Sequence, residues 1–198
     1  MKVDPSSDAD RRDDDSLVVA IGRGDRDALR VLLERWGPRV RAFLQRTLGS
    51  TRDAEDLTQE TFVRIHGAAA RYRPSGRFPA WLFRIAGNLA RRELRRRKLI
   101  ALVLGEPATR PEEIFASLPA SGAFDPESPL RDAEIRRAMA AALARLPERQ
   151  RMAVLLRFYE EMPVADIATA LGIGTRAAES LLARATRTLR TLLQDLQR

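Results

Sequence analysis

Apolar residues recur at helical spacing through most of the chain. Between Leu17 and Leu48 they fall three or four positions apart, and the Gly37-Pro38 pair predicts that this stretch is kinked or divided, because proline disrupts a helix interior. The same spacing predicts one helix from about Asp53 to Tyr72 and another from about Ala80 to Lys98. The segment from Arg73 to Pro79, with two prolines and a glycine, predicts a loop between them. The first part of the chain therefore predicts a compact helical domain.

The periodic pattern is lost in the middle of the chain and then returns. From Leu99 to about Pro129 the sequence is rich in Pro, Ala, Gly and Ser, which predicts a linker with a short helix around Glu112 to Leu118. Helical spacing resumes at Ile135, stops at Pro147, and recurs in three further segments. No segment alternates between apolar and polar residues as a strand would.

These elements predict an all-α fold with two small helical domains joined by a flexible linker. The expected division is a disordered acidic tail at 1–15, a first domain at 16–98, the linker at 99–129 and a second domain at 130–198.

Charge is distributed unevenly along the 198 residues, whose formal net charge is +8. Between Arg71 and Lys98 there are ten basic residues and one acid, Glu93. Such a segment favours a polyanionic partner, and its position inside a folded domain favours nucleic acid over a membrane surface. The absence of cysteine excludes disulfides and thiolate metal sites. The chain also lacks a long apolar run and an apolar N-terminal segment, which predicts a cytoplasmic protein.

The last two periodic segments have the form of a helix-turn-helix. A short helix near Val164 to Leu171 is followed by Gly172-Ile173-Gly174 and a long helix whose first positions are polar. The alternative is a helical hairpin that only builds the core. If the unit binds DNA, the residues expected in the major groove are Thr175, Arg176, Glu179, Ser180 and Arg184.

The predicted helix at 80–98 has one apolar and one basic face. Trp81, Leu82, Ile85, Leu89 and Leu94 form the apolar stripe, and the opposite side carries Arg84, Asn88, Arg91, Arg92 and Arg95. Aromatic residues lie beside arginines in the preceding loop, a combination that suits stacking on unpaired bases, although packing in the core is the more frequent role of such rings.

The segment DAEDLTQETF places Asp53, Asp56, Gln59 and Glu60 on one side of a helix. This acidic face either balances neighbouring arginines or suits a basic protein partner. For catalysis the sequence offers no triad around its single histidine, His66, no glycine-rich phosphate loop and no metal-ligand spacing. We therefore expect a protein that is not an enzyme and needs no cofactor or metal.

Three ordered motifs resemble the ECF (extracytoplasmic-function) group of bacterial RNA polymerase sigma factors. The motif DAEDLTQETFVRI is similar to the region 2 helix that binds polymerase, and FPAWLFRIAGNLARRELRRRK to the segment that handles the minus-ten promoter element. The sequence from Leu143 to Arg190 is similar to region 4, which reads the minus-thirty-five element. The resemblance covers about residues 16–98 and 130–193.

The resemblance implies a transcription initiation factor that binds core RNA polymerase, directs it to specific promoters and promotes strand opening. Asp53, Asp56, Gln59 and Glu60 would dock on the clamp helices of the beta-prime subunit, and an anti-sigma factor is a usual further partner. The implied contacts with the minus-ten element are Arg71, Tyr72, Arg77, Phe78, Trp81, Arg84, Asn88, Arg91 and Arg95. The chain departs from the family pattern at Arg92, Pro163 and Gly174.

Two other readings use the same features. One is a sigma-like decoy that sequesters an anti-sigma factor, although such proteins usually carry a receiver domain and degraded binding residues. The other is a helix-turn-helix repressor whose first domain binds an effector, a reading that leaves DAEDLTQETF without a role.

Overall fold

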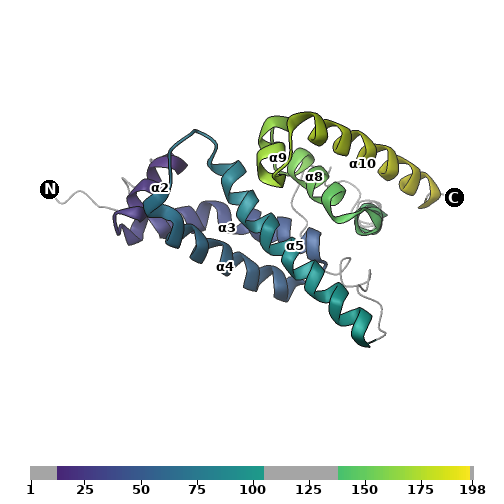
Figure 1. The fold of residues 1–198 in the computed structure, drawn as a ribbon, viewed down its shortest axis with the longest axis horizontal. Helices are drawn as coiled ribbons and strands as arrows, with labels where there is room; N and C mark the ends of the chain where they lie inside the picture. The colour runs from purple at the N-terminus through teal and green to yellow at the C-terminus, as the bar shows by residue number, and fades with distance from the viewer. Residues whose placement is uncertain (1–12, 105–137, 197–198) are drawn as a thin grey trace, which may run out of the picture.

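The computed structural model describes residues 13–104 and 138–196, and these residues form helices and no strand (Figure 1). The first domain contains α2 (Asp14–Gly22), α3 (Arg26–Leu48), α4 (Thr51–Ala68), the short 3-10 helix η1 (Ala69–Arg71) and α5 (Phe78–Leu104). In the second, a helical stretch at 138–145 precedes α8 (Glu148–Phe158), α9 (Val164–Leu171) and α10 (Thr175–Leu196). The all-α expectation is confirmed, and the short helix expected around Glu112 to Leu118 lies outside the described residues.

The first division of the helical pattern lies at residues 23–25. Gly24 has a φ of 92°, and the Asp25 carboxylate caps α3 by accepting a hydrogen bond from the amide of Ala28 at 3.0 Å. Helix α3 continues through Pro38, which is exposed. Gly37 has no Cβ to clash with the proline ring, which removes part of the penalty for helical backbone before a proline. Of the kink or division expected at Gly37-Pro38, the division is therefore wrong, because α3 is continuous there.

Helix α5 is longer than the sequence predicts. Arg97 fixes it on the domain, because its guanidinium donates hydrogen bonds to the carbonyl of Leu48 at 2.8 Å and to the carboxylate of Asp53. The helix then continues past the expected end at Lys98, and the side chains of Leu102 and Val103 are 82% and 76% exposed. Residues 99–104, assigned to the linker by the sequence, are therefore helical.

Aromatic rings hold the start of α5 against α3. Trp36 lies edge-on to Phe78 and Phe83, with ring centroids 5.7 and 6.2 Å apart, and Phe43 meets Phe83 at 5.2 Å. All four rings are buried. Edge-to-face pairs of this kind contribute about 0.5–1.5 kcal/mol beyond the area they bury.

Helices α9 and α10 form the expected helix-turn-helix. Helix α9 ends at Leu171 and is capped by Gly172, whose φ of 65° allows the amide of Ile173 to reach the carbonyl of Ala168 at 3.0 Å. Leu171 and Ala178 are buried beneath the turn. The tight turn predicted at Gly172-Ile173-Gly174 is confirmed.

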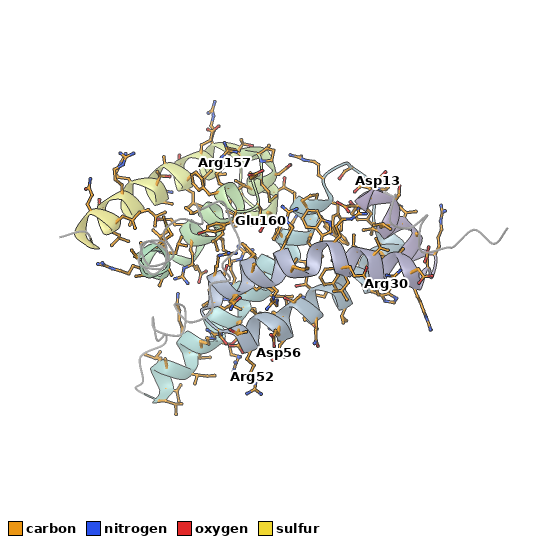
Figure 2. All side chains as sticks on the ribbon, turned by 180° about the vertical axis from the view of Figure 1, so that it is seen from behind. Asp13, Arg30, Arg52, Asp56, Arg157 and Glu160 are labelled. Carbon is orange, nitrogen blue, oxygen red and sulfur yellow. The ribbon has the colours of Figure 1, made fainter. Side chains whose placement is uncertain are left out.

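The two domains pack against each other: α9 lies along α5, and α8 contacts α3. Arg151 is buried and donates to the carbonyl of Thr47 in the first domain at 2.7 Å and to that of Ala144 in its own domain at 2.7 Å. Arg39 Nε donates to Glu160 Oε2 at 2.8 Å. Glu160 lies on the side of the second domain that faces the first (Figure 2). Buried polar groups thus join the domains.

No helix in the described ranges has both the length and the apolar character needed to cross a membrane.

Candidate nucleic-acid interface

Helix α10 presents its first turns to solvent. The five residues expected in the major groove are all exposed: Thr175, Arg176, Glu179, Ser180 and Arg184. Beneath them the apolar side of α10 packs on α8 and α9, and this leaves the polar side outward. The arrangement fits insertion of α10 into a groove of duplex DNA.

The basic face of α5 is only partly open. Arg84, Asn88 and Arg95 are exposed, whereas Arg91 is half-buried and its guanidinium donates to the side-chain oxygen of Asn88. Burial, followed by the positive charges of Arg149 and Arg95, lowers the pKa of Arg91. An arginine remains charged after such a shift, so the cluster keeps its attraction for phosphates.

The remaining candidates for the minus-ten element lie at the end of η1, in the loop that follows it and in the first turn of α5. Arg71 and Arg77 are exposed, and the Arg77 guanidinium pairs with the Asp166 carboxylate of α9 at 2.7 Å. The rings of Tyr72 and Trp81 are half-buried and lie 4.6 Å apart. Phe78 is 1% exposed.

Phe78 lies in the core of the first domain, and its expected contact with the minus-ten strand stays a prediction. Its ring packs between Trp36 and Trp81 in the core and offers no face to a base in this arrangement. An aromatic residue beside an exposed arginine fits both stacking and packing in the sequence, and in this structure the ring of Phe78 is packed.

The acidic face of α4 is divided between internal pairs and exposed groups. Asp53 accepts from Arg97, and Glu60 accepts from Arg64 at 2.7 Å. Asp56 and Gln59 are exposed. Figure 2 shows Asp56 on the outer side of α4, beside Arg52. Among the described residues no ion pair to Asp56 is present, so its carboxylate is available to a partner.

The acidic residues at the start of α2 belong to the folded domain. Asp13 caps α2 by accepting from the amide of Ser16 at 2.8 Å, and Asp14 and Asp15 lie in the first turn. The Asp15 carboxylate bonds to the 72–77 loop. The disordered tail expected at 1–15 includes all three, and for these residues the expectation is wrong. The missed signal is an aspartate directly before an apolar helical pattern.

The described ranges contain no group of three or more histidine or acidic side chains placed to hold a metal ion.

Both domains match known protein families. The family model "Sigma-70 region 2" matches residues 32–100, and "Sigma-70, region 4" matches residues 136–189. The RNA polymerase sigma factor CarQ of Myxococcus xanthus is 34% identical over 174 residues, which are 88% of this chain and 94% of that protein. The ECF RNA polymerase sigma factor BldN of Streptomyces coelicolor is 30% identical, and the match covers 96% of this chain and 70% of BldN. The chain belongs to the ECF group of RNA polymerase sigma factors.

A solved structure supports this assignment over the length of the sigma factor. CnrH, in complex with the cytosolic domain of CnrY, is 26% identical with a TM-score of 0.63, and the match covers 92% of this chain and 97% of that one. The family assignment spans both domains and so disagrees with the repressor reading, in which the first domain binds an effector. Helix α2 precedes the segment that matches region 2, so the family model does not include Asp15.

Proposed function

We propose that this sigma factor initiates transcription by using three surfaces of different charge. The acidic face of α4 docks on core RNA polymerase, α10 reads the minus-thirty-five element as duplex, and the 72–77 loop with the basic face of α5 holds the opened minus-ten strand. The observation that carries the proposal is the exposure of all five polar positions at the start of α10, in a chain that matches sigma regions 2 and 4.

Docking on polymerase depends on Asp56 and Gln59, whose side chains are exposed on α4. A carboxylate on an outer helix face meets the basic clamp helices of the beta-prime subunit by charge complementarity. Asp53 and Glu60 contribute less, because each already holds an arginine of its own domain.

Promoter reading divides between the two domains. Arg176 and Arg184 supply cationic donors for base edges and phosphates, while Glu179 and Ser180 supply acceptors. In the first domain Arg84, Asn88 and Arg95 contact phosphates of the non-template strand. Opening costs a few kcal/mol per unstacked base, which the captured strand offsets.

The exposed apolar end of α5 favours a protein partner as well. Leu102, Val103 and Leu104 are each at least 65% exposed, more than isolated surface positions need. We assign an anti-sigma factor as this partner, as the ECF resemblance implies, and place the complex in the cytoplasm with the polymerase.

Run-off transcription tests the proposal. A genomic fragment library is transcribed with bacterial core polymerase, with and without the protein, and we expect protein-dependent starts downstream of a shared two-part motif.

Asp56→Arg should abolish polymerase binding with the fold intact, whereas Arg176→Ala should keep polymerase binding and weaken promoter selection. A protein that binds polymerase or an anti-sigma factor without any dependent start is a decoy, and normal transcription from both variants removes the surface assignments.

A further inference from the structure

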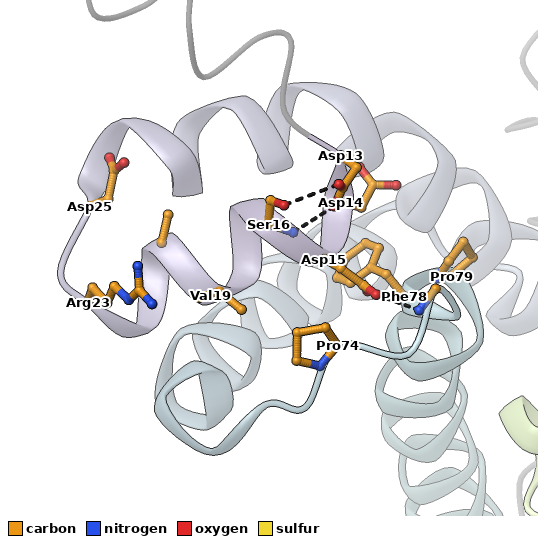
Figure 3. Close-up of a pocket in the computed structure, with 12 residues that line it drawn as sticks. Asp13, Asp14, Asp15, Ser16, Val19, Arg23, Asp25, Pro74, Phe78 and Pro79 are labelled. Atoms are coloured by element: carbon orange, nitrogen blue, oxygen red, sulfur yellow. Dashed lines mark hydrogen bonds between the residues drawn. The ribbon is translucent and has the colours of Figure 1, made fainter.

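One carboxylate of α2 holds the loop that we assign to the minus-ten strand. Asp15 Oδ2 accepts the backbone amides of Ser75, at 2.9 Å, and Gly76. Its other oxygen accepts the hydroxyl of Tyr72. In Figure 3 Asp15 points from α2 toward the loop that carries Pro74. Three donors from one short loop therefore converge on a single side chain.

These contacts fix both the backbone and an aromatic ring of the loop. Gly76 turns the chain with a φ of 66°. The ring of Tyr72 packs against that of Trp81 at a tilt of 43°, so its hydroxyl bond also fixes the ring beside the basic face of α5. Burial and the Asp15 carboxylate raise the pKa of Tyr72, which keeps its proton and donates it at neutral pH.

Helix α2 also contacts the segment that leads into the loop. A Cβ on Gly22 would lie 2.8 Å from the carbonyl oxygen of Ala69 in η1, so the two backbones pass closer than any other residue allows. At its C-terminal end, α2 therefore contacts the segment before the loop through Gly22. At its N-terminal end, it holds the tip of the loop through Asp15.

Neighbouring carboxylates on α2 have other partners. Asp13 caps the helix, and Asp14 pairs with Arg35 at 2.7 Å. A cavity of about 910 Å³ lies between α2 and the loop, with Val19 and Pro74 among its lining residues (Figure 3). Beside this open space, the hydrogen bonds of Asp15 connect α2 to the loop at Tyr72, Ser75 and Gly76.

We propose that Asp15 is a positioning residue for promoter opening: its carboxylate holds the 72–77 loop in the conformation that receives the minus-ten strand. The inference rests on the proposed function of that loop. It assigns to α2, which lies outside the family match, an indirect part in promoter selection.

Electrostatics and positioning predict opposite effects for loss of this carboxylate. Removal of a negative charge near DNA strengthens phosphate attraction, so a neutral Asn at position 14 or 15 should raise or preserve binding if charge alone matters. If Asp15 positions the loop, Asp15→Asn should reduce promoter opening in spite of its lower negative charge. Asp14→Asn is the matched control, because it makes the same change one residue away without a hydrogen bond to the loop.

The experiment uses the full chain, core polymerase and a promoter identified in the library transcription. For each variant we measure thermal unfolding, binding to core polymerase and run-off yield on this promoter and on versions with single substitutions in the minus-ten element. Asp15→Asn should bind polymerase normally and should reduce discrimination among the substituted promoters. Its run-off yield should fall about tenfold, because one or two net hydrogen bonds are lost. Tyr72→Phe, which leaves α2 unchanged, should lower the yield about threefold through loss of one hydrogen bond.

Each outcome decides the role of Asp15. Equal yield and discrimination for Asp15→Asn and Asp14→Asn overturn it, as does a higher yield for Asp15→Asn. Loss of polymerase binding together with a lower unfolding temperature shows a general structural role and also overturns it. If the unchanged chain directs no transcription, the proposed function fails and this role fails with it.

Discussion

Arg151 is a buried side chain that serves carbonyl groups of both domains. We expect Arg151→Met to lower the free energy of unfolding by about 2–4 kcal/mol, because the carbonyls of Thr47 and Ala144 lose a charged donor. Urea unfolding measures this difference. The control is Arg149→Met, an exposed position at which a change within about 0.5 kcal/mol is expected. Equal losses for the two variants would contradict the interpretation of the buried contacts.

Burial of Glu160 should make the folded protein less stable as the pH rises toward neutral. Burial raises its pKa above the usual value, and Arg39 and Arg46 reverse this only in part. An acid with a raised pKa in the folded state contributes stability that is fully present below its unfolded pKa and is lost as the pH rises through the folded value. Glu160→Gln should therefore be more stable than the unchanged protein near pH 7, and the difference should narrow toward about pH 4. Chemical unfolding of both proteins between about pH 4 and pH 7 measures this difference in stability. If Glu160→Gln is the less stable protein at neutral pH, pairing with Arg39 outweighs the cost of burial.

For a single residue, the sequence predicts whether the side chain is exposed or buried when helical periodicity alone decides which side of the helix it occupies. The five positions on α10 follow from the turn and the helical spacing. The pairing of Arg77 with Asp166 depends on how the two domains pack, which no local pattern contains. For Phe78, which follows an arginine in the loop predicted at 73–79 and in fact begins α5, the sequence fits both stacking and packing.

The close backbone contact between α2 and η1 at Gly22 should contribute to stability. Gly22→Ala should lower the free energy of unfolding by about 1–3 kcal/mol, because its Cβ meets the Ala69 carbonyl, although alanine is the better helix former. The control is Gly67→Ala on α4, where nothing lies within 4 Å of the new Cβ and stability should rise by up to about 1 kcal/mol. Denaturant titration compares them. Stabilisation by both substitutions would contradict the close approach of α2 and η1.

Element types were predictable from the sequence, whereas two boundaries were not. Proline at position 38 indicated a division, yet the missing Cβ of Gly37 and the exposed ring allow α3 to continue. Gly24 and the capping residue Asp25 carried the correct signal. The end of α5 was missed because residues 99–104 are apolar on every side, so no period marks them as helical.

The contact between the domains predicts a large rearrangement when the sigma factor binds polymerase. Arg77 is paired with Asp166 and α9 contacts α5, so the surface that we propose for the minus-ten strand is not fully accessible in this arrangement. The chain has no cysteine, so dyes can be attached through Gly67→Cys on α4 and Thr191→Cys on α10, both exposed. Energy transfer between them should fall when core polymerase is added.

A dye pair within the first domain is the control for this measurement. With Arg23→Cys, at an exposed position that follows α2, in place of Thr191→Cys, transfer should stay constant on polymerase binding. Constant transfer for both pairs would show that the domains bind polymerase in the arrangement described here.

The amides of Ser75 and Gly76 lie in an exposed loop, where backbone hydrogens normally exchange quickly with solvent. Because both donate to Asp15, their exchange is slowed for as long as α2 remains docked. Their deuterium uptake therefore reports the local opening of α2, apart from global unfolding. Two amides in the 72–77 loop thus act as a built-in probe of a helix that lies some 60 residues earlier in the chain.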